Sequence, residues 1–249
     1  MSARPRTWLV DLGNSRLKCA RADRLAADGA RAFAHAGVPG DAALVEAFAA
    51  PGEGDTVWVA SVASPAATST VVTALGTRGV RIERALTRAQ CAGVRIAYAQ
   101  PAHLGVDRFL ALLAAHARAA HPWLIASVGT ALTIDLLGAD GTHHGGLIAP
   151  APTLMRESLV QRAPHLPAAG GVVVDFAADT ADALASGVTL AARALIARSM
   201  QAARRRLGVA PCLLIAGGGA DALLDGWRVR AQRAPDLVLE GLRIYARHG

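Results

Sequence analysis

A short run near the start of the chain, TWLVDLGNSRLKCA (7–20), combines an apolar segment with residues that can handle phosphate. The apolar residues predict a buried strand, and Asp11 stands at its end, where a carboxylate could hold Mg²⁺, mostly through water. Gly13, Asn14 and Ser15 then predict a turn whose backbone amides and polar side chains can donate to phosphate oxygens. The same residues also fit an ordinary β-turn closed by an Asx hydrogen bond, so the run does not by itself establish a phosphate site.

Lys18 lies three residues beyond this turn and is the only lysine among the 26 basic residues of the chain. Its ammonium group is a compact charge that can reach the β- or γ-phosphate of a nucleotide. The spacing matches neither the Walker pattern G-x-x-x-x-G-K-[ST] nor G-x-G-x-x-G. We expect a phosphate-binding role for Lys18, and the alternative is a solvent-exposed remnant that arginine could replace.

Two later segments also place small residues directly after apolar strands. SVGTALTID (127–135) offers Gly129 and Thr130 as a second phosphate-binding turn, and GGGAD (217–221) could admit a base or ribose close to the backbone. Each segment alone also fits a tight turn. Together with the first run they resemble, in order, the phosphate-1, phosphate-2 and adenosine elements of the acetate and sugar kinase, Hsp70 and actin superfamily.

A fourth segment, YAQPAHLGVDRFLALLAAHARAAH (98–121), predicts a turn followed by an amphipathic helix. Tyr98 precedes the turn, and Asp107 falls in the first turn of the helix. There the helix dipole favours an ionised carboxylate. Taken alone, Asp107 is best interpreted as a charge that stabilises the helix start.

Alternating strands and helices predict an α/β protein with a largely parallel sheet. Apolar runs predict strands at 7–11, 57–62, 123–128, 132–137 and 212–216. Segments rich in Ala, Leu and Arg predict helices at 41–50, 66–76, 106–120, 153–161, 180–206 and 236–246. WLVDLGNS (8–15) resembles WLIASVGT (123–130), and this echo predicts two related halves, 1–120 and 121–249, with a ligand cleft between them.

Composition narrows the class of protein. Hydrophobic residues make up 53% of 249 residues, but no stretch reaches the roughly 20 uncharged residues that span a bilayer. The first apolar run is too short for a signal peptide, so we expect a soluble, cytoplasmic protein with no membrane partner. Three scattered cysteines argue against a disulfide framework and a zinc site. The pair His143–His144 stands beside glycines and predicts a polar hairpin turn rather than a metal site.

The net charge of +7 raises the question of a nucleic-acid partner. The densest basic run, 204–206, comes just before Gly208, so we expect it in the last turn of a helix, where the dipole favours cations. Aromatic residues make up only 4% of the chain, so stacking platforms for single strands are scarce. A nucleic-acid partner is therefore not expected.

The order of these motifs strongly resembles the type III pantothenate kinase family, which includes the Bvg accessory factor branch. The matching segments are D-x-G-N-[TS] at 11–15, G-x-D-R at 105–108, G-T-A-x-T-x-D at 129–135, GGLIAPAPTLMRESL at 145–159, LP at 166–167, DTADALASG at 179–187 and GGG at 217–219. Each piece is unspecific, but the combination covers nearly the whole chain in family order.

The resemblance implies two ribonuclease-H-like halves with a nucleotide cleft between them, and ATP-dependent phosphorylation of pantothenate to 4'-phosphopantothenate. Asp107 would be the catalytic base and Asp11 would hold magnesium through water. The implied ATP- and phosphate-binding residues are Asp11, Leu12, Gly13, Asn14, Ser15, Arg16, Leu17, Lys18, Gly129 and Thr130. The implied pantothenate-binding residues are Tyr98, Gly105, Val106, Asp107, Arg108 and Thr180, with Thr180 reaching across a homodimer interface.

Two positions depart from the family pattern. The family usually has an aspartate two residues before the glycine of G-T-A, where it helps to bind a monovalent cation, and this chain has Ser127. Whether a K⁺ or NH₄⁺ site survives here is therefore open. The family's Pro-Gly appears as Pro150–Ala151, which alanine tolerates unless the turn needs a positive φ. The alternative functions are another small-molecule kinase of the superfamily and a nucleic-acid-binding transcription accessory protein.

Overall fold

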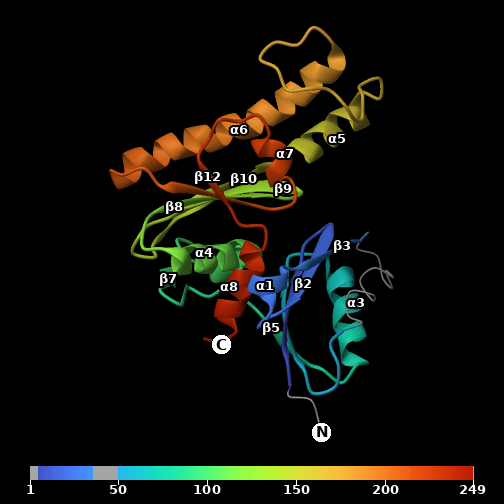
Figure 1. The fold of residues 1–249 in the computed structure, drawn as a ribbon, viewed down its shortest axis with the longest axis vertical. Coiled ribbons are helices and arrows are strands. Elements are labelled where there is room, and N and C mark those ends of the chain that lie inside the picture. The colour runs from blue at the N-terminus through green and yellow to red at the C-terminus, as the bar shows by residue number, and fades with distance from the viewer. Residues whose placement is uncertain (1–4, 36–49, 249) are drawn as a thin grey trace. The chain divides into compact units, whose positions relative to one another are not determined.

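The computed structural model describes residues 5–35 and 50–248, and the chain divides into two compact units. The first comprises Met1–Ala119, Asp140–Thr142 and Asp236–Gly249, and the second comprises Ala120–Ala139 and His143–Pro235. The expected division at residue 120 differs from this because the C-terminal segment falls with the first unit. Its helix α8 (Leu237–Tyr245) packs against α4 (Val106–Arg118), and a side chain at Gly241 would overlap the backbone of Leu110 there (Figure 1).

The first unit is built on a sheet with the strand order β3-β2-β1-β4-β5. Its strands are β1 (Thr7–Leu12), β2 (Arg16–Arg21), β3 (Arg31–Ala34), β4 (Thr56–Ser61) and β5 (Arg81–Arg84). Strands β1 to β3 form an antiparallel meander, whereas β4 and β5 run parallel to β1. Helix α3 (Pro65–Gly76) covers one face of the sheet, and α4 and α8 lie on the other (Figure 1). The short elements are α1 (Leu25–Asp28), β6 (Gln90–Cys91), β7 (Val94–Arg95) and the 3₁₀ turn Pro101–His103.

The second unit repeats this plan with the strand order β10-β9-β8-β11-β12. Its strands are β8 (Trp123–Val128), β9 (Ala131–Leu137), β10 (His143–Pro150), β11 (Cys212–Ala216) and β12 (Ala231–Arg233). Its helices are α5 (Pro152–Arg162), α6 (Thr180–Leu207) and α7 (Ala220–Leu224). Again the first three strands are antiparallel and the last two are parallel to the central one. The sequence echo therefore corresponds to the central strands, β1 and β8, of two sheets with the same order.

The expected strands and helices are present with small shifts at their ends, except for the helix expected at 41–50. Of that segment, 41–49 lie outside the described residues, and residue 50 lies in a bend. The expectation of a largely parallel sheet is wrong, because β2, β3, β9 and β10 add antiparallel hairpins to each sheet. Strand β9 was predicted at 132–137, but β2, β3 and β10 were missed. β2 (RLKCAR) is rich in charged residues, β10 (HHGGLIAP) begins with histidines and glycines, and β3 has only four residues.

The hairpin turn expected at His143–His144 is also wrong. The turn lies just before this pair, and His143 is the first residue of β10, with a fully buried side chain. Its Nε2 lies 3.0 Å from Oδ1 of Asp135 on the paired strand β9. Two polar side chains are buried here because each supplies the other's hydrogen bond.

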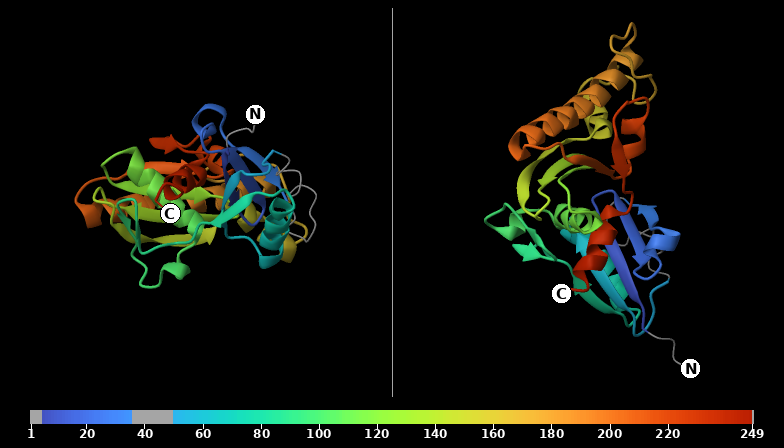
Figure 2. Two further views of the ribbon diagram at one scale, coloured as in Figure 1. Left: turned by 90° about the horizontal axis from the view of Figure 1, so that it is seen from below. Right: turned by 60° about the vertical axis from the view of Figure 1, so that its left-hand side comes forward.

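Helix α6 is the one helix of the described residues that is long and apolar enough, by composition, to cross a membrane. The core helix of a soluble protein meets the same criterion, and α6 lies along the sheet of the second unit (Figure 2). Its residues Ala192, Ile196 and Ala203 are buried in the core of this unit. The Asp179 carboxylate caps its first turn, and Gly208 ends it with a φ of 72°. The basic run 204–206 occupies its last turn, as expected from the dipole argument.

Candidate active site

The alternation of side chains along β1 and β2 places Asp11 and Lys18 on one face of the first sheet. Trp8, Val10 and Leu12 face the core beneath α3, so Asp11 points to the face that α4 and α8 cover. Lys18 is the register partner of Asp11 on the neighbouring strand. Directly opposed residues of antiparallel strands are close neighbours, so a carboxylate and an ammonium group stand side by side.

The turn between these strands, residues 13–15, has the form of a tight hairpin. The backbone N–H of Gly13 donates to the carbonyl oxygen of Arg16 at 2.9 Å, and Asn14 and Ser15 are exposed. Their polar groups are therefore open to a ligand. Leu12 and Leu17, by contrast, are register partners with side chains fully buried in the core. At those two positions only the backbone is available to a phosphate.

Asp107 lies in the first turn of α4, as the sequence predicts. Its Oδ1 folds back over Gly105, where it would stand 2.6 Å from a Cβ, so a side chain at this position would displace the Asp107 carboxylate. The Asp107 carboxylate is also close enough to Asp11 to influence its charge. Burial, and secondarily the charge of Asp107, raise the pKa of Asp11 from its usual value to about 7, while Lys18 opposes the rise.

Two neighbouring carboxylates of this kind fit a divalent cation, which relieves their repulsion. Among residues 5–35 and 50–248 no group of three or more His, Cys, Asp or Glu side chains could hold a metal by itself. Magnesium is usually bound by one or two carboxylates together with water and substrate phosphates. Asp11 therefore fits magnesium that arrives with a nucleotide, and Asp107 beside it stays available as a base.

Asp236 is a site residue that sequence reasoning missed. Lys18 Nζ donates to its Oδ1 at 3.2 Å, and both side chains are about four-fifths buried, at 22% and 19% exposed. Its other oxygen, Oδ2, accepts from the backbone N–H of Ala30 at 3.1 Å. The only sequence signal was an acid at the start of the helix expected at 236–246, which says nothing about a partner 218 residues away.

Tyr98 and Arg108 lie together near the start of α4. Arg108 is buried, with 6% of its surface exposed, and its Nη1 donates to the Tyr98 hydroxyl at 3.2 Å. Its guanidinium also lies over the Tyr98 ring, 5.9 Å from the centroid. Val106, between Gly105 and Asp107, packs into the core. The segment therefore holds Asp107 between rigidly packed neighbours.

The remaining predicted site residues belong to the second unit. Gly129 and Thr130 are exposed in the turn between β8 and β9, where the Gly129 N–H donates to the carbonyl oxygen of Ala131 at 2.9 Å. This turn takes the place of the Gly13 turn of the first unit, but it is shorter, because the Gly13 N–H bonds to a residue three positions on and the Gly129 N–H to one two positions on. Thr180 is exposed at the first residue of α6, and Ser127 is half-buried near the end of β8.

The backbone of the second unit explains why glycine stands at position 217 and why alanine is accepted at position 151. Gly217 has a φ of 89°, and a side chain there would overlap the carbonyl of Val128, so close strand packing requires glycine at this position. Ala151, which replaces the family's glycine, has a φ of −73°, a region that alanine adopts without strain.

Several solved structures of other proteins share the fold of this chain. The chain is similar to a protein of Campylobacter jejuni assigned to the Baf family of transcriptional activators, with a TM-score of 0.63, 17% identity and 95% of both chains covered. It is also similar to a protein of Sinorhizobium meliloti assigned as a 2-dehydro-3-deoxygalactonokinase, with a TM-score of 0.55, 16% identity and 97% and 98% coverage. At such identities the likeness concerns the fold. The two sheets with the same strand order therefore have the fold of these two proteins.

Sequence comparison is more specific. A family model described as type III pantothenate kinase matches residues 8–202. Relatives called type III pantothenate kinase include one from Stenotrophomonas maltophilia strain K279a, 54% identical over 241 residues, with 97% of both chains covered. Another, from Xanthomonas euvesicatoria pv. vesicatoria, is 53% identical over 239 residues with 96% of both chains covered. The chain belongs to the type III pantothenate kinase family.

Proposed function

We propose that the chain transfers the γ-phosphoryl group of ATP to the primary hydroxyl of pantothenate, which yields 4'-phosphopantothenate for coenzyme A biosynthesis. The observation that carries the mechanism is the grouping of Asp11, Lys18 and Asp107 on one face of the first sheet. Phosphoryl transfer needs little covalent chemistry from the protein, because positioning and charge neutralisation supply most of the catalysis. A base, a metal-binding carboxylate and a compact cation are the groups that this reaction uses.

Each group takes one role in this proposal. An oxygen of Asp107 accepts the proton of the pantothenate hydroxyl as the hydroxyl oxygen bonds to the γ-phosphorus and ADP leaves. Lys18 contacts the β- and γ-phosphates, and Asp11 holds magnesium, mostly through water; when bound, the metal neutralises charge on the phosphates. Asn14, Ser15 and the backbone of their turn donate to phosphate oxygens, with Gly129 and Thr130 as a second set. Tyr98, Gly105, Arg108 and Thr180 hold pantothenate.

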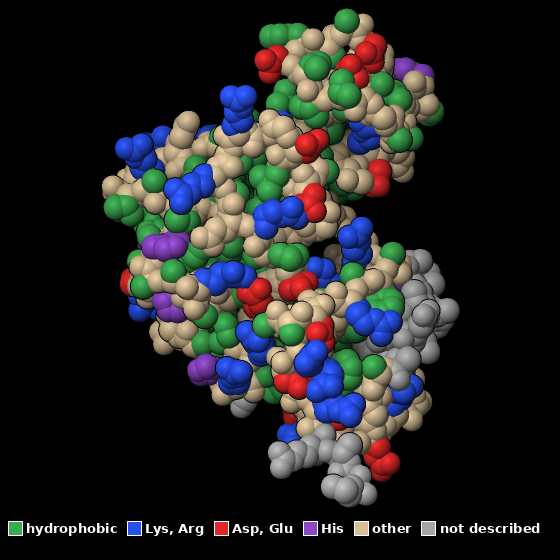
Figure 3. All heavy atoms as spheres, viewed as in Figure 1, with side chains coloured by type: hydrophobic (Ala, Val, Ile, Leu, Met, Phe, Trp, Pro, Cys, Tyr) green, Lys and Arg blue, Asp and Glu red, His purple; other side chains and the backbone are tan. Residues whose placement is uncertain are grey.

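A coupled assay of ADP release with and without pantothenate tests this function. We expect release to depend on both pantothenate and magnesium. ADP release that occurs with another hydroxyl acceptor but not with pantothenate would show that the chain is a different small-molecule kinase. Salt-dependent binding to DNA without ATP turnover would instead support the accessory-protein alternative. That alternative has little support, because Lys and Arg side chains are scattered over the visible face and form no single stripe (Figure 3).

Asp236 is proposed as a positioning residue for Lys18. Asp11 and Asp236 both attract the ammonium group of Lys18. Because Lys18 forms its ion pair with Asp236, the Asp11 carboxylate stays available for magnesium. We expect Asp236→Asn to raise the KM for MgATP by about tenfold, roughly the worth of one charged hydrogen bond, with less effect on the KM for pantothenate. In a Lys18→Ala background the same change should have almost no effect. Equal losses in both backgrounds would contradict the positioning role.

A homodimer is the proposed oligomeric state, and its support is an apolar loop on the second unit. Phe176 is 98% exposed and Val172 is 62% exposed. The loop is nevertheless anchored, since the N–H groups of Val172 and Val174 donate to Asp182 and Ser186 of α6. Exposed apolar side chains on an anchored backbone are typical of an interaction surface. Hydrophobic atoms gather at the end of this unit that carries α5 and the start of α6 (Figure 3).

Phe176→Ser should weaken the dimer. Burying a phenylalanine contributes about 1.5–3 kcal/mol, and a symmetric interface loses it twice, so the dissociation constant should rise by at least about 10²-fold. Sedimentation equilibrium measures this change. Leu86→Ser is the matched control, since Leu86 is 63% exposed on the first unit. A wild-type chain that is monomeric at all concentrations would contradict the proposal.

A weak monovalent-cation requirement is proposed from Ser127. A serine hydroxyl offsets the charge of a half-buried cation less well than the family's carboxylate. We therefore expect less than about tenfold stimulation when K⁺ or NH₄⁺ replaces Na⁺ at constant ionic strength, and a larger stimulation in Ser127→Asp. Strong stimulation of the wild type would instead mean that backbone carbonyls or another acid complete the site.

A further inference from the structure

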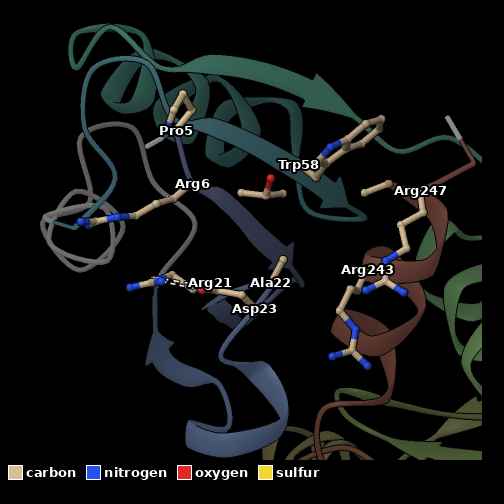
Figure 4. A pocket seen from close by; sticks show the side chains of 10 residues that line it. Pro5, Arg6, Arg21, Ala22, Asp23, Trp58, Arg243 and Arg247 are labelled. Atoms are coloured by element: carbon tan, nitrogen blue, oxygen red, sulfur yellow. Dashed lines mark hydrogen bonds and ion pairs between the residues drawn. The ribbon is translucent and has the colours of Figure 1, made fainter. Parts of the chain in front are cut away.

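A cavity of about 630 Å³ lies on the first unit and plays no part in the proposed reaction. Its lining comes from the segment before β1, the end of β2, the middle of β4 and the end of α8 (Figure 4). Thr7, at the start of β1, lines it, whereas Asp11 stands four residues further along the strand. At about 3.4 Å per residue these positions are roughly 14 Å apart, so the cavity is separate from the candidate active site.

Four arginines, Arg6, Arg21, Arg243 and Arg247, line this cavity, against a single acid, Asp23. Arg21 donates to both carboxylate oxygens of Asp23, at 3.1 and 2.6 Å, so this ion pair already neutralises the charge of Asp23. Among the residues that the structure describes, no carboxylate pairs with Arg243 or Arg247.

Arg243 lies in the last turn of α8 and Arg247 just beyond its end, four positions further along the chain, and both line the cavity (Figure 4). Within the described ranges of the chain neither has a hydrogen-bond or ion-pair partner for its guanidinium group. Like charges at this spacing repel each other, so their juxtaposition is unfavourable until an anion lies between them. Guanidinium groups match phosphate oxygens with paired hydrogen bonds.

The rest of the wall is firmly built and partly apolar. Trp58 lines the cavity, and its ring is fixed edge-on against Tyr245, with centroids 5.7 Å apart. Arg6 is anchored through its backbone N–H, which donates to Asp55 at 2.8 Å. The site therefore offers cationic groups beside an indole ring on a prearranged frame.

We propose that this cavity binds a small polyphosphate ester, a molecule with two or more adjacent phosphate groups next to a flat apolar group. The guanidinium groups of Arg243 and Arg247 bind the phosphates, and Trp58 contacts the apolar part. Neither contact depends on the kinase activity, so the proposal stands apart from the proposed function.

Calorimetry with inorganic pyrophosphate and with ADP-ribose tests this site. All chains carry Lys18→Ala and are measured without magnesium, which weakens phosphate binding at the candidate active site. We expect both probes to bind one site, ADP-ribose more tightly, and Arg243→Ala/Arg247→Ala to weaken both at least tenfold. The control Arg204→Ala/Arg205→Ala removes the same charge from exposed positions of α6 and should bind as the parent does.

Three results would overturn the proposal. The parent chain could bind neither probe, or the two double variants could lose affinity equally, which would show a general charge effect. The Arg243→Ala/Arg247→Ala variant could also bind like the parent. Thermal melting of each variant checks its fold, and the paired arginine changes in an otherwise wild-type chain should leave pantothenate-dependent ADP release unchanged.

Discussion

Asp107→Asn is expected to lower kcat by about 10²–10⁴-fold, the usual contribution of a positioned general base. The asparagine side chain has nearly the same shape and fits the same space over Gly105, but its amide cannot accept the hydroxyl proton. The change also removes a negative charge beside Asp11, so the nucleotide-free chain should be no less stable. The rate of ADP release and the melting temperature of the purified variant measure the two effects.

Glu240→Gln is the matched control for this prediction. Glu240 is an acid in the first turn of α8, and it forms an ion pair with Arg118 of α4. If the acid in the first turn of each helix serves only the helix dipole, both Asp107→Asn and Glu240→Gln should lower the free energy of unfolding by about 0.3–1 kcal/mol and leave turnover unchanged. A folded Asp107→Asn chain that turns over at nearly the wild-type rate would refute the assignment of the base.

Lys18→Arg is expected to lower kcat/KM for ATP by about 10- to 100-fold, which corresponds to the roughly 1.5–3 kcal/mol of a charge-assisted hydrogen bond. The Lys18 side chain is only 22% exposed, and its ammonium group stands between two carboxylates, Asp11 and Asp236. A guanidinium group is larger and planar, so it cannot keep the contact with Asp236 and also reach the same phosphate position. Initial rates at varied ATP and saturating pantothenate give the ratio directly.

Arg204→Lys is the control for this exchange, since Arg204 is exposed in the last turn of α6, away from the candidate active site, and the charge is conserved. We expect it to leave the ATP dependence unchanged. An unchanged ATP dependence in Lys18→Arg would mean that this lysine is a replaceable surface cation, in line with the alternative that the sequence left open.

Local patterns in the sequence were sufficient to predict several features of this protein. Neighbouring residues predicted the strand that leads to Asp11, the turn of small residues after it and the acid in the first turn of α4. This was possible because strand alternation, turns and helix starts depend on short-range sterics and hydrogen bonding. The echo between 8–15 and 123–130 predicted two related halves. In the structure each run contributes the central strand of one of the two sheets. The ordered set of motifs led to the family to which the chain belongs.

Tertiary structure alone decided the features that join distant segments. Helix α8 belongs to the first unit, and Asp236 at its start meets Lys18 across 218 residues, because burial and charge pairing select partners by distance in space. The raised pKa of Asp11 needs both burial and the nearby Asp107, and neither can be read from a strand pattern. Arg243 and Arg247 likewise line one cavity with Arg6 and Trp58 only because the end of α8 lies beside β1, β2 and β4.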